Sequence, residues 1–158
     1  SGLVKVTVPY NLPLEELDID CGAGKIEIQN ITANQLDIDA GAGSLEIDAS
    51  NFNHVDIDGG AGEINIKSSL LRDLDLDAGV GKIQIDGEIY GKSKIDSGVG
   101  EISLILGKKE DYSLKIEKGL GTIKIDKEEY GNDTTYGNGL NFIHIDGGVG
   151  NINVNFQS

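Results

Sequence analysis

Four aspartates at equal intervals of 19 residues are the part of this sequence most able to do chemistry. Each is followed two residues later by a second aspartate, so every repeat holds two acidic positions. If the repeats stack at the spacing of neighbouring strands, the carboxylates lie about 4.8 Å apart along each row. Hard cations such as Ca²⁺ take oxygen ligands of this kind. The first row therefore supplies the candidate metal ligands, which are Asp18, Asp37, Asp56 and Asp75.

Two interpretations of this first row stay open. A calcium ion takes about six to eight converging oxygens, whereas a flat grid of exposed carboxylates presents few of them to any one point. The alternative is a solvated face whose charge opposes aggregation. Nothing local requires an acid at these positions, and stacked carboxylates repel each other by about 1 kcal/mol per adjacent pair even in water. The first row is therefore the one without a structural explanation.

The second acidic row has a structural interpretation. Its members stand just before a glycine turn, where an aspartate can accept hydrogen bonds from backbone N–H groups about two residues ahead. The sequence therefore predicts that these side chains brace the turns. The row consists of Asp20, Asp39, Asp58, Asp77, Asp96, Glu117 and Asp146.

A second candidate site is the segment 126–141, which interrupts the repeats and concentrates glycines and aromatic residues. Its candidate ligand-binding residues are Tyr130, Asp133 and Tyr136, which would suit a carbohydrate. Paired carboxylates on β-helices can also cleave polysaccharides. Such enzymes need a cleft, and the other connectors here are short and lack tryptophan. We predict no catalytic residue and no cofactor.

The single cysteine and the two histidines add no further site. Cys21 occupies a corner position that small residues hold in the next repeats, so we expect it to pack rather than react. His54 and His144 belong to different repeats and are too far apart to share a metal ion.

The elements that carry these residues are copies of one pattern, two short alternating runs around a glycine turn. The second glycines of successive turns are separated by 19, 19, 19, 19, 21 and 29 residues. A fixed period of this length is typical of proteins built from stacked coils. The copies are 17–28, 36–47, 55–66, 74–85, 93–104, 114–125 and 143–154.

Within each copy apolar and polar residues alternate, which predicts strands with one buried and one exposed face. An antiparallel meander would turn each glycine pair into a hairpin, but it does not require equal repeat lengths. A solenoid does, because each residue stacks on its counterpart one coil away. The sequence therefore predicts an all-β, single-domain parallel β-solenoid of about seven coils with a period of about 19 residues. It divides into an N-terminal cap strand region at 3–16, six coils at 17–125, an insertion at 126–141, and a last coil with the C-terminal edge at 142–158.

The composition excludes several classes of function. The formal net charge is −14, with 27 acidic against 13 basic residues, so the basic footprint of a nucleic-acid binder is missing. No apolar run approaches the roughly 18 residues of a membrane helix, and no membrane insertion is predicted within this fragment. The chain contains no methionine. We expect it to be a trimmed fragment whose signal or membrane anchor lies upstream.

The LDID-xGxG-xIxI pattern, from VKVTVP to INVNF, resembles bacterial domains of unknown function that are named as adhesins. Those domains are β-solenoids related to the head domains of auto-transporter adhesins. The resemblance covers nearly the whole chain and brings no catalytic residues. It implies an extracytoplasmic location in the bacterial cell envelope or at the cell surface.

We therefore expect a non-enzymatic cell-surface module with an adhesin-like or structural role, whose ligand is an envelope protein or glycan. The alternatives are a calcium- or carbohydrate-binding module and, as a weaker reading, a polysaccharide-active enzyme. An exposed terminal coil also predicts end-to-end self-association, because an unpaired strand edge can accept another strand.

Overall fold

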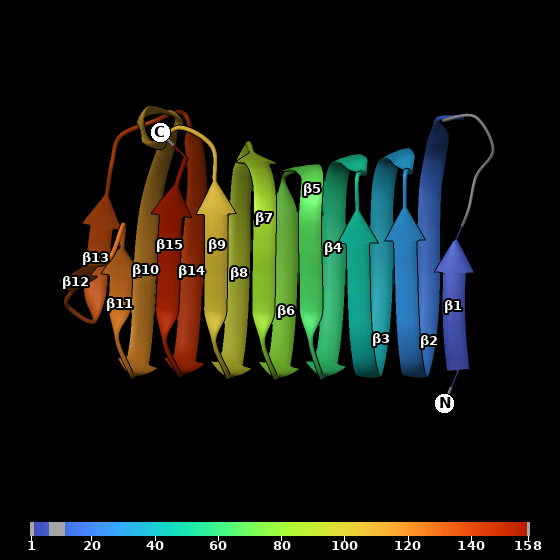
Figure 1. Ribbon diagram of the computed structural model, residues 1–158, viewed down its shortest axis with the longest axis horizontal. Coiled ribbons are helices and arrows are strands. Elements are labelled where there is room, and N and C mark those ends of the chain that lie inside the picture. Colours follow the sequence, from blue (N-terminus) through green and yellow to red (C-terminus); the bar gives the residue numbers. More distant parts are fainter. Residues whose placement is uncertain (1, 7–11, 158) are drawn as a thin grey trace.

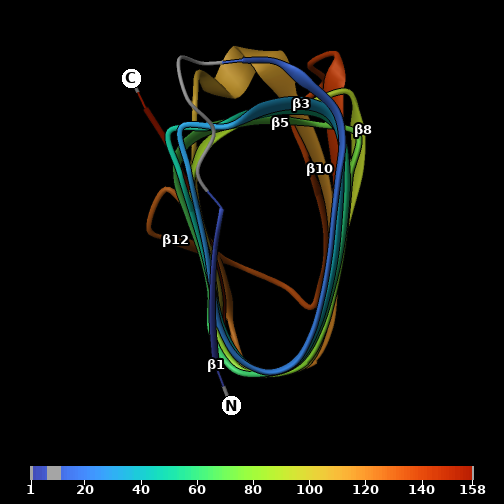
Figure 2. The ribbon, with the colours of Figure 1, turned by 90° about the vertical axis from the view of Figure 1, so that its right-hand side faces the viewer.

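The computed structural model describes residues 2–6 and 12–157, and it confirms an all-β parallel solenoid with a period of about 19 residues. Each coil is an elongated loop with two long sides, a glycine corner at one end and a connector side at the other (Figure 2). The expected N-terminal cap is described only as β1 (Gly2–Val6) and the residues from Leu12 onward. Residues 7–11 of that cap lie outside the described part.

The first five copies stack in chain order. In two of them a single strand runs through both long sides, and these strands are β2 (Leu14–Gln29) and β3 (Thr32–Asp48). The residues of β2 lie beside their counterparts 19 residues later in β3, as Leu17 does beside Leu36. The following copies are divided at the corner into β4 (Asn51–Ala61), β5 (Ile64–Arg72), β6 (Leu74–Val80), β7 (Ile83–Tyr90), β8 (Lys92–Val99) and β9 (Ile102–Leu106).

The core consists of the inward ladders that the alternation predicts. Leucine, isoleucine and valine side chains of successive coils stack on each other, and most are less than 3% exposed. The connectors close the third side of each coil, as their apolar residues indicate. The buried side chains there include Ile31, Phe52, Leu71 and Ile89.

The glycine corner depends on close contact between coils. Gly62 has a φ of +132°, and its N–H donates to the carbonyl oxygen of Val80 in the next coil at 2.9 Å. A Cβ atom at Gly62 would overlap the carbonyl oxygen of Gly43 in the preceding coil. Both the backbone angle and the space therefore require glycine at this position.

The last two copies do not follow chain order, and here the expectation is wrong. The sixth copy holds β10 (Tyr112–Leu120) and β11 (Ile123–Ile125), and the seventh holds β14 (Asn141–Val149) and β15 (Ile152–Phe156). β14 pairs with β8 on one side and β10 on the other, and β15 lies between β9 and β11. The seventh copy thus sits between the fifth and the sixth (Figure 1). Residues 142–157 form an inner coil, not the C-terminal edge.

Lys118 explains why the sixth copy must be at an end. It occupies the inward corner position that small residues hold in every other copy, namely Cys21, Ala40, Gly59, Ala78, Ser97 and Gly147. An inner coil offers this side chain neither space nor water, and burying an unpaired charge is costly. At the end coil the Lys118 ammonium donates to the carbonyl oxygen of Gly121 and, at 3.2 Å, to Oδ1 of Asn132.

The insertion closes this end of the solenoid. Its strands β12 (Glu128–Tyr130) and β13 (Asp133–Tyr136) pair antiparallel with β11 and β10. The chain reaches the sixth copy through a longer connector that contains a short 3₁₀ turn at Lys109–Asp111. This repeat is two residues longer than the usual period. The extra length allows the connector to pass the seventh copy, which lies between the fifth and the sixth.

Candidate functional site

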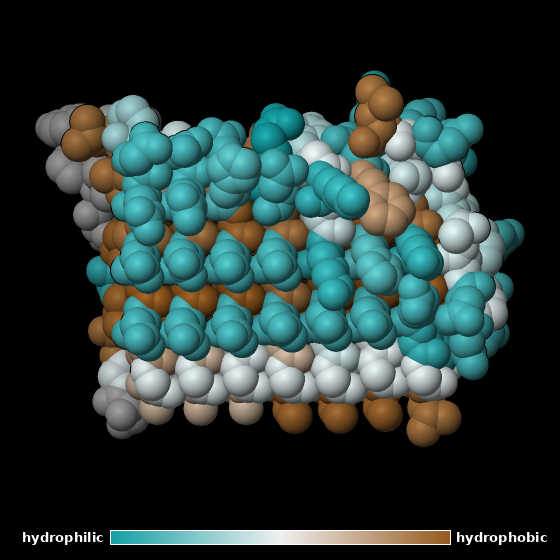
Figure 3. Space-filling view, turned by 180° about the vertical axis from the view of Figure 1, so that it is seen from behind, coloured by the Kyte–Doolittle hydropathy of each residue, from teal (hydrophilic) through white to brown (hydrophobic). Residues whose placement is uncertain are grey.

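The two acidic rows form one flat face, which we call the acidic face. It is defined by Asp18, Asp20, Asp37, Asp39, Asp56, Asp58, Asp75 and Asp77. The register confirms that each of these residues lies directly beside its counterpart in the next coil. Two hydrophilic rows run side by side along this face of the molecule (Figure 3). The carboxylates point to solvent while the alternate residues of the same strands fill the core.

The interleaved seventh copy changes the charge at the far end of the first row. Beyond Asp75 the row continues with Lys94, His144 and Lys115. Glu117 in the second row lies 3.0 Å from Nε2 of His144 and 3.4 Å from Nζ of Lys115. Hydrogen bonds from His144 and Lys115 lower the pKa of Glu117. The acidic face thus ends against a mixed, charge-paired patch.

Asp56 lies in the middle of the acidic face and has no such cation beside it. Partial burial raises the pKa of Asp56, and the carboxylates of Asp37 and Asp75 raise it further. Asp58 and Asp77 in the second row act in the same direction. The Asp56 carboxylate therefore opposes folding at neutral pH, because its charged form is partly buried and is repelled by the carboxylates aligned with it.

The turn-bracing interpretation of the second row is wrong. Among the described residues, none of its carboxylates accepts a hydrogen bond from a turn N–H group. The turn N–H groups donate to the next coil instead, as Gly81 does to Val99 at 2.9 Å and Gly100 to Val149 at 2.8 Å. Because the ladder between coils already satisfies the turn, neither acidic row has a local structural task.

The candidate metal ligands Asp18, Asp37, Asp56 and Asp75 lie in one row, as predicted. Within the described residues, however, no three or more histidine, cysteine, aspartate or glutamate side chains converge to hold a metal ion. The reason is geometric, because side chains that project in parallel from neighbouring strands do not surround a common point.

The raised pKa of Asp56 predicts a pH effect. A carboxylate with a raised pKa in the folded state contributes stability below its ordinary value of 3.8 and loses this contribution as the pH rises through the raised value. We expect Asp56→Asn to stabilise the protein at pH 7, and this gain to shrink as the pH falls towards 4. Melting temperatures measured across this range would show it, with Asp86→Asn on the opposite side as the control. An equal gain at pH 7 from both variants would contradict the argument.

The tyrosines of the insertion help to cover the end of the solenoid that the insertion closes. The ring of Tyr136 stacks on Phe156 with centroids 5.8 Å apart, and the ring of Tyr130 meets Tyr136 edge-on at 6.0 Å. Both tyrosines pack against the core cluster, whereas Asp133 is exposed. The structure therefore brings the tyrosines together as a packed cover over the sixth coil, in which Tyr136 stacks on Phe156.

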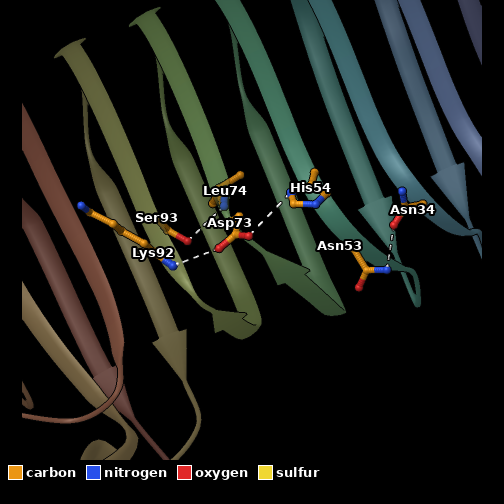
Figure 4. Close-up of polar contacts among 7 residues, drawn as sticks. All are labelled: Asn34, Asn53, His54, Asp73, Leu74, Lys92 and Ser93. Atoms are coloured by element: carbon orange, nitrogen blue, oxygen red, sulfur yellow. Dashed lines mark hydrogen bonds and ion pairs between the residues drawn. The ribbon is translucent and has the colours of Figure 1, made fainter.

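Polar contacts also run along the connector side (Figure 4). Nδ1 of His54 lies 3.6 Å from Oδ2 of Asp73, and Oδ1 of Asp73 accepts a hydrogen bond from the Lys92 N–H at 3.1 Å. Asn53 donates to Asn34 one coil away at 3.2 Å. These contacts connect neighbouring coils. His54 has a structural role in them through its pair with Asp73.

Cys21 lies at the corner of the first coil and is partly exposed. Its thiol hydrogen-bonds to the carbonyl oxygen of Ala23 at 3.5 Å. No histidine lies in its own coil or in the one beside it. The packing role expected for Cys21 agrees with this position.

One surface feature was missed by the sequence reasoning. The middle residue of each glycine turn projects from the corner, and these residues form a row that becomes larger and more apolar along the solenoid (Figure 3). The members at that end are 46–69% exposed, and they are Val80, Val99, Val149 and Leu120. The signal was present, because the same position of the repeat changes from alanine to valine and leucine.

The described residues form shallow hollows and no pocket that gathers reactive groups. One hollow of about 390 Å³ lies beside the C-terminal end and is lined by Lys108, Lys109, Glu110, Asp126, Phe156 and Gln157. It contains two carboxylates, but Oδ1 of Asp126 accepts a hydrogen bond from the Phe156 N–H at 2.9 Å. This carboxylate therefore has a structural role at the end of β15.

The fold and the surface define a repeat protein of the β-solenoid class whose outward side chains form straight rows. The sequence matches the family described as Toastrack DUF4097 over residues 1–155, and the chain belongs to this family of domains of unknown function. No curated protein and no solved structure matches the chain. In the described residues, no helix is long and apolar enough to span a membrane.

Proposed function

We propose that this chain is a non-enzymatic interaction module that works outside the bacterial cytoplasm and contacts its partner across the acidic face. The observation that carries this proposal is that the outward residues stay in register from coil to coil. A flat, regular surface of this kind suits an extended partner rather than a small molecule. The sign of the charge favours a basic partner.

The energetics of the acidic face support this role. Partial burial raises the pKa of Asp56, and the carboxylates beside it raise this pKa further, so the middle of the face acts against folding. In the described part of the chain, these carboxylates brace no turn. A surface that lowers stability and has no structural role is better explained by a function. The extracytoplasmic location rests on the resemblance to adhesin-type domains, and protease treatment of intact cells carrying the full-length protein would test it.

The partner surface can be mapped with a fluorescent hexalysine peptide and two variants of equal charge. One variant changes Asp18, Asp37, Asp56 and Asp75 to asparagine, and the other changes Glu27, Glu46, Glu63 and Glu88 to glutamine. Only the first variant is expected to lose binding in fluorescence polarisation. Equal losses would mean that net charge alone attracts the peptide. A rise in melting temperature with millimolar Ca²⁺ that the first variant abolishes would favour a calcium-binding module instead.

A further inference from the structure

The glycine corner carries a straight row of exposed aliphatic side chains over the fourth to seventh copies, which we call the apolar ridge (Figure 3). The register places its members side by side, and each is 46–69% exposed. They are Val80, Val99, Val149 and Leu120. The aligned residues of the first three copies are all alanine, so the corner itself does not require a larger side chain.

The ridge projects from a backbone whose hydrogen bonds are already made. Val99 lies between Gly98 and Gly100, which have no side chains to cover it. The Gly100 N–H donates to the carbonyl oxygen of Val149 at 2.8 Å, and the carbonyl oxygen of Val99 accepts from the Gly81 N–H at 2.9 Å. Because these groups belong to the ladder between coils, a partner can contact the ridge only through side chains.

The two flanks of the ridge differ in charge. Three residues before each ridge position stands an acid, and this acidic flank consists of Asp77, Asp96, Asp146 and Glu117. Two residues after each ridge position the charges cancel, since that flank consists of Lys82, Glu101, Asn151 and Thr122. Between the ridge and the acidic flank runs a shoulder of glycines, formed by Gly79, Gly98, Gly148 and Gly119.

The acidic flank is electrostatically unfavourable in the free protein. Partial burial raises the pKa of Asp96, and the carboxylates of Asp146 and Asp77 raise it further. Lys94 and His144 act in the opposite direction without cancelling the shift. Cationic groups placed along this flank would relieve the repulsion between the carboxylates. The ridge therefore has an apolar row and a row that favours cations, about 10 Å apart along the strand.

We infer that an amphipathic helix of a partner protein docks on the glycine shoulder, with its apolar stripe against the ridge and Lys or Arg side chains against the acidic flank. The helix axis runs along the solenoid, because ridge residues repeat about every 4.8 Å. The apolar stripe of a helix repeats about every 3.5 residues, or about 5.3 Å. Over the length of the ridge the two spacings diverge by only about 1.4 Å, so each ridge side chain meets the stripe.

Other occupants fit this surface less well. A second copy of the chain offers no basic row beside an apolar one, because in the described residues neither flank of its own ridge is basic. A flat bilayer would touch both flanks at once, and anionic lipids would be repelled by the acidic flank. A helix with one basic side matches the asymmetry of the flanks.

A pair of designed peptides tests this inference. In the helix formed by acetylated LKALKQALKALKQA the leucines make one stripe and the lysines lie along one side of it. The control LKLAKQALKLAKQA keeps the composition and the lysine positions but moves half of the leucines to the opposite face. Each peptide carries a C-terminal fluorescein, and binding is read by fluorescence polarisation. We expect the control to bind at least about tenfold more weakly, because half of its apolar contact is lost.

The matched protein variant changes all four ridge residues to alanine, which the first three copies already hold at this position. It should bind the first peptide at least about tenfold more weakly and hexalysine as tightly as the unchanged protein does. The inference stands apart from the proposed function, because hexalysine binding can fail while ridge-dependent binding persists.

Three results would overturn the inference. The first is an absence of binding by LKALKQALKALKQA, and the second is equal binding by the control peptide or by the alanine variant. The third is that the ridge serves another occupant. Co-sedimentation with phosphatidylcholine vesicles that the alanine variant loses would assign it to a lipid surface, and a dimer in analytical ultracentrifugation that the variant loses would assign it to a second copy.

Discussion

A chain that ends at residue 140 is expected to lose the folded sixth coil together with the seventh. The removed residues include four inward aliphatic side chains that are at most 1% exposed, Ile143, Ile145, Ile152 and Val154. Burial of each such side chain contributes about 1.5–3 kcal/mol. The sum, about 6–12 kcal/mol, is comparable to the whole stability of a typical domain. The truncation also separates the sixth coil from the fifth, because the seventh joins them.

Limited trypsin digestion measures this effect. In the truncated chain Lys115 and Lys124 should be cut readily, whereas in the intact chain their strands are paired and protected. A chain that begins at residue 7, and so lacks only the half-coil β1, is the control and should keep its sixth coil. Resistance of Lys115 and Lys124 after truncation would mean that the sixth coil stacks directly on the fifth.

A pair of engineered disulfides checks the same coil order without truncation, in a Cys21→Ser background. Lys94→Cys with His144→Cys should form a disulfide, because these residues are aligned on adjacent strands. Lys94→Cys with Lys115→Cys should not, because the seventh coil lies between them. If only Lys94→Cys with Lys115→Cys formed a disulfide, the sixth coil would stack directly on the fifth, in the order of the chain.

Replacing Gly62 by alanine is expected to be strongly destabilising. The φ of +132° is strained for any residue with a Cβ atom, and the new methyl group would overlap backbone rather than a movable side chain. Strain at such an angle costs about 1–3 kcal/mol, and overpacking a further 1–3 kcal/mol. We expect a loss of about 2–6 kcal/mol in urea unfolding.

The neighbouring residue provides a close control for this substitution. Ala61→Val adds two methyl groups one residue away, in a row where the aligned residue is Val80 and is 55% exposed. It should change stability by less than about 0.5 kcal/mol, as surface substitutions usually do. If Gly62→Ala and Ala61→Val cost the same, the corner is not constrained as the structure indicates.

The regular part of the fold could be predicted because its cause is local and repeated. Equal spacing places Leu17, Leu36 and Val55 in one ladder, and alternation places their neighbours in solvent. The order of the last coils could not be derived from periodicity, because the sixth and seventh copies carry nearly the same pattern. One residue did hold the information. Lys118 replaces a small corner residue, and only an end coil tolerates a lysine there.

The candidate site was predicted in part. The four aspartates lie in one row as expected, since a shared face follows from the period alone. The turn-bracing role of Asp58 and its row failed, because the ladder between coils takes the turn N–H groups that a lone hairpin would leave free. The role of Tyr130 and Tyr136 depends on Phe156, which lies 20 residues or more away in sequence and reaches them only through the interleaved coil.

The position of the seventh copy has a consequence for synthesis on the ribosome. The sixth copy ends at residue 125, and the 29 residues up to the end of the seventh copy at residue 154 take about 1.5–6 s to be added at 5–20 residues per second. During that time the sixth copy meets the bare edge of the fifth, which has the same pattern as its final neighbour. Any pairing between them has to open again before β14 and β15 can enter. Formation of the sixth coil therefore requires an insertion step, because β14 and β15, which are made after it, join it to the fifth coil.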